Sequence, residues 1–129
     1  MNFPENLKYT KTHEWVEDLG DGRYRIGITD YAQDKLGNLV YVNLPEEGDE
    51  LESGEAFADV ESVKAVSDVV SPADGDIIAV NEDLQDEPEL MNNSPYEAWF
   101  VEAENLTFGE ELMDAAAYEA FCEAEDQEG

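Results

Sequence analysis

The chain has almost no residues of the kinds that form disulfides or bind metals. Among 129 residues there is one cysteine, Cys122, and one histidine, His13. A single cysteine excludes an internal disulfide, and with one histidine it does not supply the donor set of a usual zinc site. His13 and Glu14 begin like the zinc-protease motif, but Glu17 stands where that motif needs its second histidine. We therefore expect no metal centre.

Long apolar runs are also missing, because no uninterrupted run exceeds four residues. A membrane-spanning helix needs about 20 mostly apolar residues, and the apolar part of a signal peptide about 7–15. The first five residues, MNFPE, have no Arg-rich amphipathic character either. The sequence therefore predicts a cytoplasmic protein with no membrane partner.

Basic side chains are scarce, since six lysines and arginines stand against 34 aspartates and glutamates, for a formal net charge of −28. Without a basic patch the chain cannot neutralise phosphates, so neither nucleic acid nor anionic lipid is an expected partner. Such a charge repels itself at ordinary ionic strength, whereas near 1 M salt the screening length falls to about 3 Å. We infer a cytoplasm of multimolar salt, as in extreme halophiles.

Catalytic patterns are absent as well. The chain has no G-x-S-x-G, P-loop or G-x-G-x-x-G sequence. Carboxylates are so frequent that any pair of them is uninformative, and a run such as Glu46, Glu47 and Asp49 is read as a solvated face rather than a calcium site. An enzyme that acts through its own side chains is not expected.

What the chain does contain describes a folded protein. Hydrophobic residues make up 42% of the sequence and aromatic residues 10%, which is enough for a core at this length. The length is also that of one domain. We therefore expect a single domain over residues 1–129.

Alternating apolar residues predict that this domain is mainly β. Turns are expected at residues 20–22 and 71–75, and strands at residues 24–28, 40–44, 77–80 and 99–101. Between the first two strands a short helix fits, with Asp30 as its N-cap and Gly37 as its C-terminal stop.

The end of the chain has a helical pattern. Residues from about 107 to 123 are predicted to be helical, because Thr107 begins a capping-box spacing and Asp114 can cap a further turn. Cys122 shares the apolar face of this segment and is expected to pack as a small hydrophobe. After it the chain is too polar to bury anything, so residues 124–129 are predicted to fray.

Residues 56–70 form a β-rich stretch about three times the usual strand length of roughly 5–6 residues, so it should fold back as a hairpin. It lies at the centre of a hairpin region that covers about residues 50–82. No Asn-Gly or Pro-Gly marks a primed turn, but a type I turn fits Val63 and Lys64. Most lysines are solvated surface charges. At a hairpin tip, however, Lys64 is placed to present its amine.

Four motifs in order resemble the glycine cleavage H-protein family. They are residues 9–16 (YTKTHEWV), 27–33 (GITDYAQ), 39–45 (LVYVNLP) and 61–68 (ESVKAVSD). Shorter matches continue in the family's order at Ser71-Pro72, Asn81-Glu82, residues 88–90 and the helix at residues 114–121. The resemblance thus covers nearly the whole chain.

The resemblance implies a lipoyl-domain-like fold, a flattened barrel-sandwich hybrid of two similar sheets with a lysine-bearing hairpin, short helices and a C-terminal helix. It implies a carrier whose Lys64 holds lipoate through an amide. The implied partners are a pyridoxal-phosphate glycine decarboxylase, a tetrahydrofolate-dependent aminomethyltransferase, a dihydrolipoamide dehydrogenase and a lipoate-attaching enzyme. The carrier itself is implied to be non-catalytic and is expected to be a monomer.

Further site residues follow from the resemblance alone. Glu14 and Asp68 match acidic residues associated with a surface cleft that receives the loaded arm. Glu61, three residues before the lysine, and Gly75, eleven after it, match positions that lipoate-attaching enzymes are expected to read, although Gly75 also fits a simple turn. Lys35 departs from the family, because some members carry a histidine there.

Other readings of Lys64 remain open on the sequence. A biotin carrier has a similar fold, but its lysine normally lies between methionines. A lipoyl domain of a 2-oxoacid dehydrogenase usually belongs to a longer chain with linkers. An H-like protein that serves lipoate transfer, or an unmodified acidic interaction module with a free Lys64, would also be compatible with this sequence.

Overall fold

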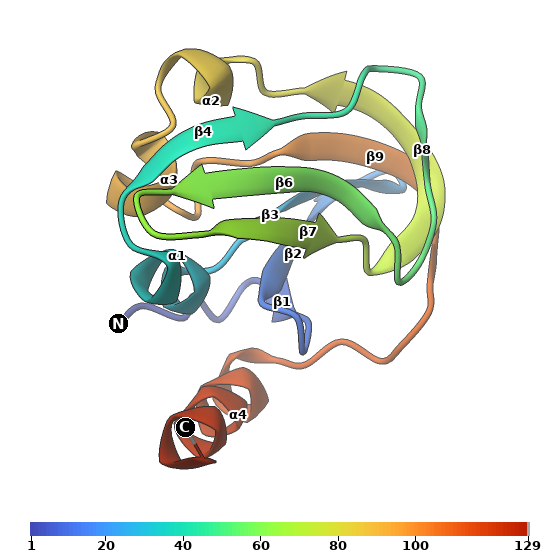
Figure 1. The fold of residues 1–129 in the computed structure, drawn as a ribbon. Helices are drawn as coiled ribbons and strands as arrows, with labels where there is room; N and C mark the ends of the chain where they lie inside the picture. Colours follow the sequence, from blue (N-terminus) through green and yellow to red (C-terminus); the bar gives the residue numbers. More distant parts are fainter. Residues whose placement is uncertain (129) are drawn as a thin grey trace.

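Two antiparallel sheets form the body of the protein in this computed structural model, which describes residues 1–128. The larger sheet has the strand order β1-β2-β3-β9-β8-β5 and the smaller one the order β4-β6-β7. Figure 1 shows the small sheet lying across the face of the large one. Within the described residues the sheets do not join into a closed barrel. The strands are β1 (Lys8–Tyr9), β2 (Glu14–Gly20), β3 (Arg23–Ile28), β4 (Leu39–Asn43), β5 (Glu50–Leu51), β6 (Ala56–Ser62), β7 (Val66–Val70), β8 (Ala73–Val80) and β9 (Val101–Phe108).

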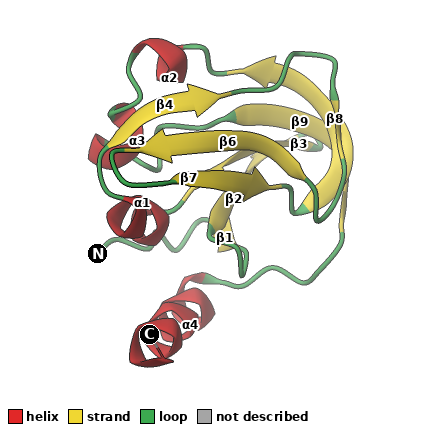
Figure 2. Cartoon of the chain, in the orientation of Figure 1, coloured by secondary structure: helices red, strands yellow, loops and turns green. Residues whose placement is uncertain are grey.

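The helices lie at the margins of the sheets (Figure 2). They are α1 (Asp30–Leu36), α2 (Asp83–Asp86), α3 (Leu90–Asn93) and α4 (Ala115–Glu128). In Figure 1, α1 lies beside the tip of the β6–β7 hairpin, and α4 lies below β1. Among the residues described, no helix is both long enough and apolar enough to cross a bilayer.

The hydrophobic core has two parts. One fills the space between the sheets with buried aliphatic and aromatic side chains such as Ile26, Val60 and Phe100. The other joins α4 to the start of the chain, where the rings of Tyr9 and Tyr118 stack at 4.6 Å. This second part fixes α4 against β1 and β2.

The predicted mainly β architecture is confirmed, with adjustments at the ends of elements. The first predicted helix is present as α1, but its N-cap is Thr29 rather than Asp30, since the Thr29 Oγ1 accepts a hydrogen bond from Ala32 N. Thr29 is wholly buried, and its hydroxyl also lies 2.7 Å from the Tyr118 hydroxyl. Contact with a distant residue therefore settles which side chain caps the helix.

The predicted helical segment at residues 107–123 was wrong at both ends. Thr107 and Phe108 continue β9, because they pair with Asp74 and Ala73 of β8. The helix α4 begins at Ala115, and Asp114 caps it as expected by accepting a hydrogen bond from Ala117 N. It continues to Glu128 where fraying was predicted, and its last turns are held by contacts described below. Gly129, the end of the predicted tail, lies outside the described residues.

Two further predictions for loops and strands were also wrong in detail. The turn expected at residues 71–75 is shorter, because β8 begins at Ala73 and Gly75 pairs with Leu51 of β5. A Cβ at Gly75 would overlap the Leu106 side chain and approach the Glu104 carbonyl oxygen to 3.0 Å. Gly75 is therefore a glycine of close strand contact, not of a turn. The late strand begins only at Val101 and runs far beyond it.

Candidate functional site

The predicted hairpin is present, and Lys64 lies at its tip. Strands β6 and β7 are joined by three residues, and the turn is closed by Ser62 N donating to Ala65 O at 2.8 Å. The Ser62 hydroxyl oxygen also accepts hydrogen bonds from Lys64 N at 3.3 Å and Ala65 N at 3.1 Å. Neither Val63 nor Lys64 has a positive φ, so the turn is not of the primed kind. Ser62 therefore supports the turn through hydrogen bonds between its hydroxyl and the turn backbone.

The tip is anchored to the loop after α1. Val63 N donates a hydrogen bond to Asn38 O at 3.1 Å. The Lys64 side chain runs over Gly37, where an added Cβ would lie 3.5 Å from Cε and 3.9 Å from Nζ. Lys64 is exposed and forms no ion pair among the described residues, although the chain is highly acidic. The amine is thus held near the end of α1 while staying open to solvent.

A cavity of about 450 Å³ has Leu36, the last residue of α1, in its lining. Its walls come from α1, from β7 immediately after the hairpin, from the β1–β2 loop and from the end of α4. The lining residues are Thr12, His13, Tyr31, Ala32, Lys35, Leu36, Ser67, Glu125 and Asp126. Because Leu36 directly precedes Gly37, over which Lys64 lies, we call this cavity the arm cleft.

Polar contacts fasten α4 to the other side of the arm cleft. Asp126 pairs with Lys35 Nζ at 2.9 Å and accepts a hydrogen bond from the Tyr31 hydroxyl at 2.8 Å. Both contacts lower the pKa of the Asp126 carboxyl, and the hydrogen bond to Asp126 raises the pKa of Lys35. The Lys35 ammonium also lies 5.3 Å from the centre of the Tyr31 ring. These side chains hold the last turns of α4 in place.

His13 makes a second set of contacts with α4. Its Nε2 lies 2.9 Å from the Glu125 carboxylate, and its Nδ1 lies 2.7 Å from the Tyr118 hydroxyl. Since a carboxylate only accepts, Nε2 carries a proton in the contact with Glu125. The backbone of His13 has a φ of +72°, which points the ring toward α4 from a strained turn.

Glu14 is a buried acid next to this wall. Its side chain is only 2% exposed and accepts hydrogen bonds from the hydroxyls of Thr10 at 2.8 Å and Thr12 at 2.5 Å. Burial raises the pKa of Glu14 to about 7, in spite of these hydroxyls and of a hydrogen bond from the Val70 backbone, which oppose the rise. The group can therefore gain or lose a proton near neutral pH.

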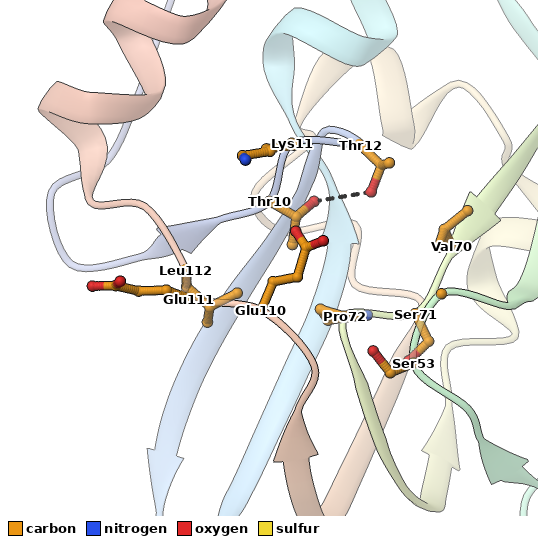
Figure 3. A pocket seen from close by; sticks show the side chains of 11 residues that line it. Thr10, Lys11, Thr12, Ser53, Val70, Ser71, Pro72, Glu110, Glu111 and Leu112 are labelled. Atoms are coloured by element: carbon orange, nitrogen blue, oxygen red, sulfur yellow. Dashed lines mark hydrogen bonds between the residues drawn. The ribbon is translucent and has the colours of Figure 1, made fainter.

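A smaller cavity of about 130 Å³ lies on the other side of the same threonines. In Figure 3, Thr10 and Thr12 stand on one side of it and Val70, Ser71 and Ser53 on the other. The strand β7 thus borders both cavities, through Ser67 at the arm cleft and Val70 here.

The structure does not bring all predicted site residues together. Glu14 and Asp68 do not line the arm cleft; their neighbours His13 and Ser67 do. Asp68 is exposed and pairs across the small sheet with Asp59 of β6. Glu61 is exposed three residues before Lys64, whereas Gly75 lies on β8 in the other sheet.

Sequence reasoning missed the residues that wall the arm cleft. Tyr31, Glu125 and Asp126 were read as parts of ordinary helices or of a frayed end, because their contacts span about a hundred positions of the chain. The only available signal was His13, the single histidine, next to a predicted strand.

The fold and the site together define a class: a two-sheet, mainly β domain that presents a lysine on a tight hairpin beside a cleft. The sequence model described as "Glycine cleavage H-protein" matches residues 7–125. The chain belongs to this family.

Similarity to individual proteins of this family agrees with the assignment. The chain is 54% identical over 125 residues to the glycine cleavage system H protein of Lachnoclostridium phytofermentans, covering 97% of this chain and 98% of that one. It is 54% identical over 117 residues to a probable glycine cleavage system H protein of Pyrococcus furiosus, with 88% and 87% covered. The crystal structure of a glycine cleavage system H protein from Mycobacterium marinum matches with a TM-score of 0.85 at 39% identity, over 92% of this chain and 97% of that one.

Proposed function

We propose that this chain carries lipoate on Lys64 as the lipoyl carrier of a glycine cleavage system. The observation that carries the proposal is the placement of Lys64: exposed, without an ion pair, and fixed at the tip of a hairpin by Ser62 and Asn38. Family membership over residues 7–125 adds the expected modification.

Attachment requires an activated acyl donor, which a lipoate-attaching enzyme supplies. The unprotonated Lys64 Nζ attacks the carbonyl carbon of that donor, the bond from this carbon to the leaving group breaks, and the nitrogen gives up one proton as the amide forms. The product has no charge at this position. The formal net charge would therefore change from −28 to −29.

The carrier would serve three enzymes in turn. When bound, lipoate supplies a dithiolane that takes up an aminomethyl group and electrons and is later reoxidised. The donor of the aminomethyl group is a pyridoxal-phosphate glycine decarboxylase, its acceptor a tetrahydrofolate-dependent aminomethyltransferase, and the electrons pass to a dihydrolipoamide dehydrogenase. The chain's own part is to present the arm and recognise these partners as a non-catalytic, cytoplasmic monomer.

The arm cleft supports a second role, which is to shelter the loaded arm. Its lining includes Leu36, one residue before the glycine over which Lys64 runs, and Asp126, so an ammonium-bearing group entering it would meet an acid already held by Lys35. Lys35 stands where some family members carry histidine, and its pairing with Asp126 gives this position a structural role here. Glu14 and Asp68 are proposed to act at the border of this cleft rather than in its lining.

Recognition by the lipoate-attaching enzyme is proposed to involve Glu61 and Gly75. Glu61 is exposed on the hairpin that bears Lys64. Gly75 would act through the strand packing that only glycine permits, since a Cβ there overlaps Leu106. A direct contact is thus proposed for Glu61 and a shape requirement for Gly75.

Reconstitution tests this function. Wild-type protein, lipoylated beforehand, is mixed with a family glycine decarboxylase, and exchange of labelled carbon dioxide into glycine is measured. We expect exchange that depends on the carrier and none with Lys64→Arg, which keeps the charge but removes the attachment site. A lipoylated wild type without exchange would favour the lipoate-transfer protein, and exchange with Lys64→Arg would contradict the proposal.

A further inference from the structure

An exposed apolar patch surrounds the turn that bears Lys64. It consists of Val40, Tyr41, Val63 and Val66, which are 53%, 52%, 69% and 65% exposed, and we call it the tip patch. Five large hydrophobic residues are exposed in the described part of the chain, and the fifth is Met1. An acidic protein with few exposed apolar side chains thus places four of them around one lysine. Such clustering marks an interaction site more often than scattered apolar residues do.

The strand register places three of the four tip-patch side chains on the outer face of the small sheet, and the fourth, Val63, lies in the adjoining turn. Tyr41 of β4 pairs with Glu61 of β6, which pairs with Val66 of β7, so the three side chains form a row on the outer face of the small sheet. Val40 is added to this face by the irregular pairing between Leu39 and Tyr41. The core side of the same sheet is formed by Val42 and Val60.

Charge on the tip patch restricts what can cover it. Glu61 lies in the middle of the row, and the next row holds Asp59 and Asp68 facing each other. A second copy of this chain would bring two surfaces of a protein of charge −28 together. A fitting partner therefore offers an apolar surface bordered by basic side chains, opposite Glu61 and the two aspartates.

The short length of the Lys64 side chain indicates which partner covers the tip patch. An enzyme that acylates Lys64 must bring its reacting carbonyl to Nζ, at the end of only four methylene groups, so its surface has to contact the turn itself. Enzymes that act later meet the far end of a long arm and need not approach the turn so closely. We infer that the tip patch is the docking surface for the enzyme that acylates Lys64, with Val63, Val66 and Tyr41 as its apolar contacts around Glu61.

This inference rests on the proposed function, and exposed positions make it testable without unfolding the protein. Val63→Thr with Val66→Thr changes little in shape or strand propensity but makes both contacts polar. Val63→Ile with Val66→Ile is the matched control, because it keeps them apolar. Tyr41→Thr and its control Tyr41→Phe examine the third contact in the same way.

The measurement is the steady-state rate at which a purified lipoate-attaching enzyme acylates each variant. For both threonine variants we expect KM for the carrier to rise by about tenfold with kcat nearly unchanged, which is the sign of lost binding. The isoleucine and phenylalanine controls should stay close to wild type. Equal KM values for threonine variants and wild type would overturn the inference.

The remaining outcomes separate this inference from the proposed function. If wild type is not acylated at Lys64, the proposed function itself fails. If wild type is acylated and sedimentation shows a dimer that the threonine variants lose, the patch is covered by a second copy and the inference is wrong. A monomeric wild type, acylated with a KM that depends on the tip patch, supports both.

Discussion

At the scale of single residues, the buried acid Glu14 is the most unusual feature. A carboxylate excluded from water is costly unless hydrogen bonds compensate for it. Thr10 and Thr12 provide two such bonds, yet burial still raises its pKa to about 7 from the usual 4.5. The folded state therefore binds this proton more tightly than the unfolded chain does. Stability from this group is present below about pH 4.5 and is lost as the pH rises through about 7.

Glu14→Gln should remove this dependence. The shift from 4.5 to about 7 corresponds to roughly 3 kcal/mol, so at pH 8 the variant should be more stable than wild type by about 2–3 kcal/mol, and at pH 4.5 nearly equal to it. Urea unfolding at both pH values, at one fixed salt concentration, measures this. Glu47→Gln, an exposed acid between β4 and β5, is the control. A Glu14→Gln variant that is less stable than wild type at pH 8 would mean that the ionised group contributes to the fold.

Single residues also show what a sequence can and cannot reveal. Lys64 could be placed at a hairpin tip because the β-rich stretch was too long for one strand, and that evidence is local. Gly75 was assigned to a turn by its neighbours Pro72 and Asp74, whereas its real constraint is Leu106 on another strand. Asp68 was matched by position to a cleft, but strand alternation places it on the exposed outer face of the small sheet.

At the scale of elements, α4 depends on contacts that its own sequence does not show. Its polar end pairs with α1 through Lys35 and Asp126 and with the β1–β2 loop through His13 and Glu125. The predicted fraying failed for this reason, since polar residues that cannot be buried can still be paired. Because α4 forms one wall of the arm cleft, these pairs also maintain the shape of the cleft.

Removing both acids should therefore loosen α4 without affecting the sheets. In Glu125→Gln with Asp126→Asn, we expect amide hydrogen exchange in α4 to become roughly two- to fivefold faster per lost pair, while β3 and β9 keep their wild-type rates. Glu123→Gln, an exposed acid on the same helix, serves as the control. Unchanged exchange in α4 would show that Tyr118 and the apolar contacts hold the helix alone.

At the scale of the whole molecule, the charge of −28 is the dominant property. Lysine and arginine form two ion pairs among the described residues, and opposite-charge contacts do little to offset so large an excess of carboxylates. Some acids even face each other, as Asp59 and Asp68 do across β6 and β7. Repulsion of this kind is weakened by salt, so the fold is expected to need a saline solution.

Unfolding in a potassium chloride series tests that expectation. The urea midpoint of the wild type, followed by circular dichroism near pH 7.5, should rise steadily from dilute buffer to 1 M salt and above. Near pH 4.1, which is the isoelectric point expected from the sequence, the net charge is close to zero and the rise should be much smaller. A protein fully folded in dilute buffer, with the same midpoint throughout the series, would contradict the halophilic interpretation.

The central claim is that Lys64 is an attachment site for lipoate, and the mass of the intact protein tests it most directly. The full chain is incubated with a lipoate-attaching enzyme, ATP and lipoate, and its mass is compared with that of Lys64→Arg treated in the same way. We predict one lipoyl group on wild type, located at Lys64 by peptide mapping, and none on Lys64→Arg. An unmodified wild type, or a lipoyl group that persists in Lys64→Arg, would contradict it.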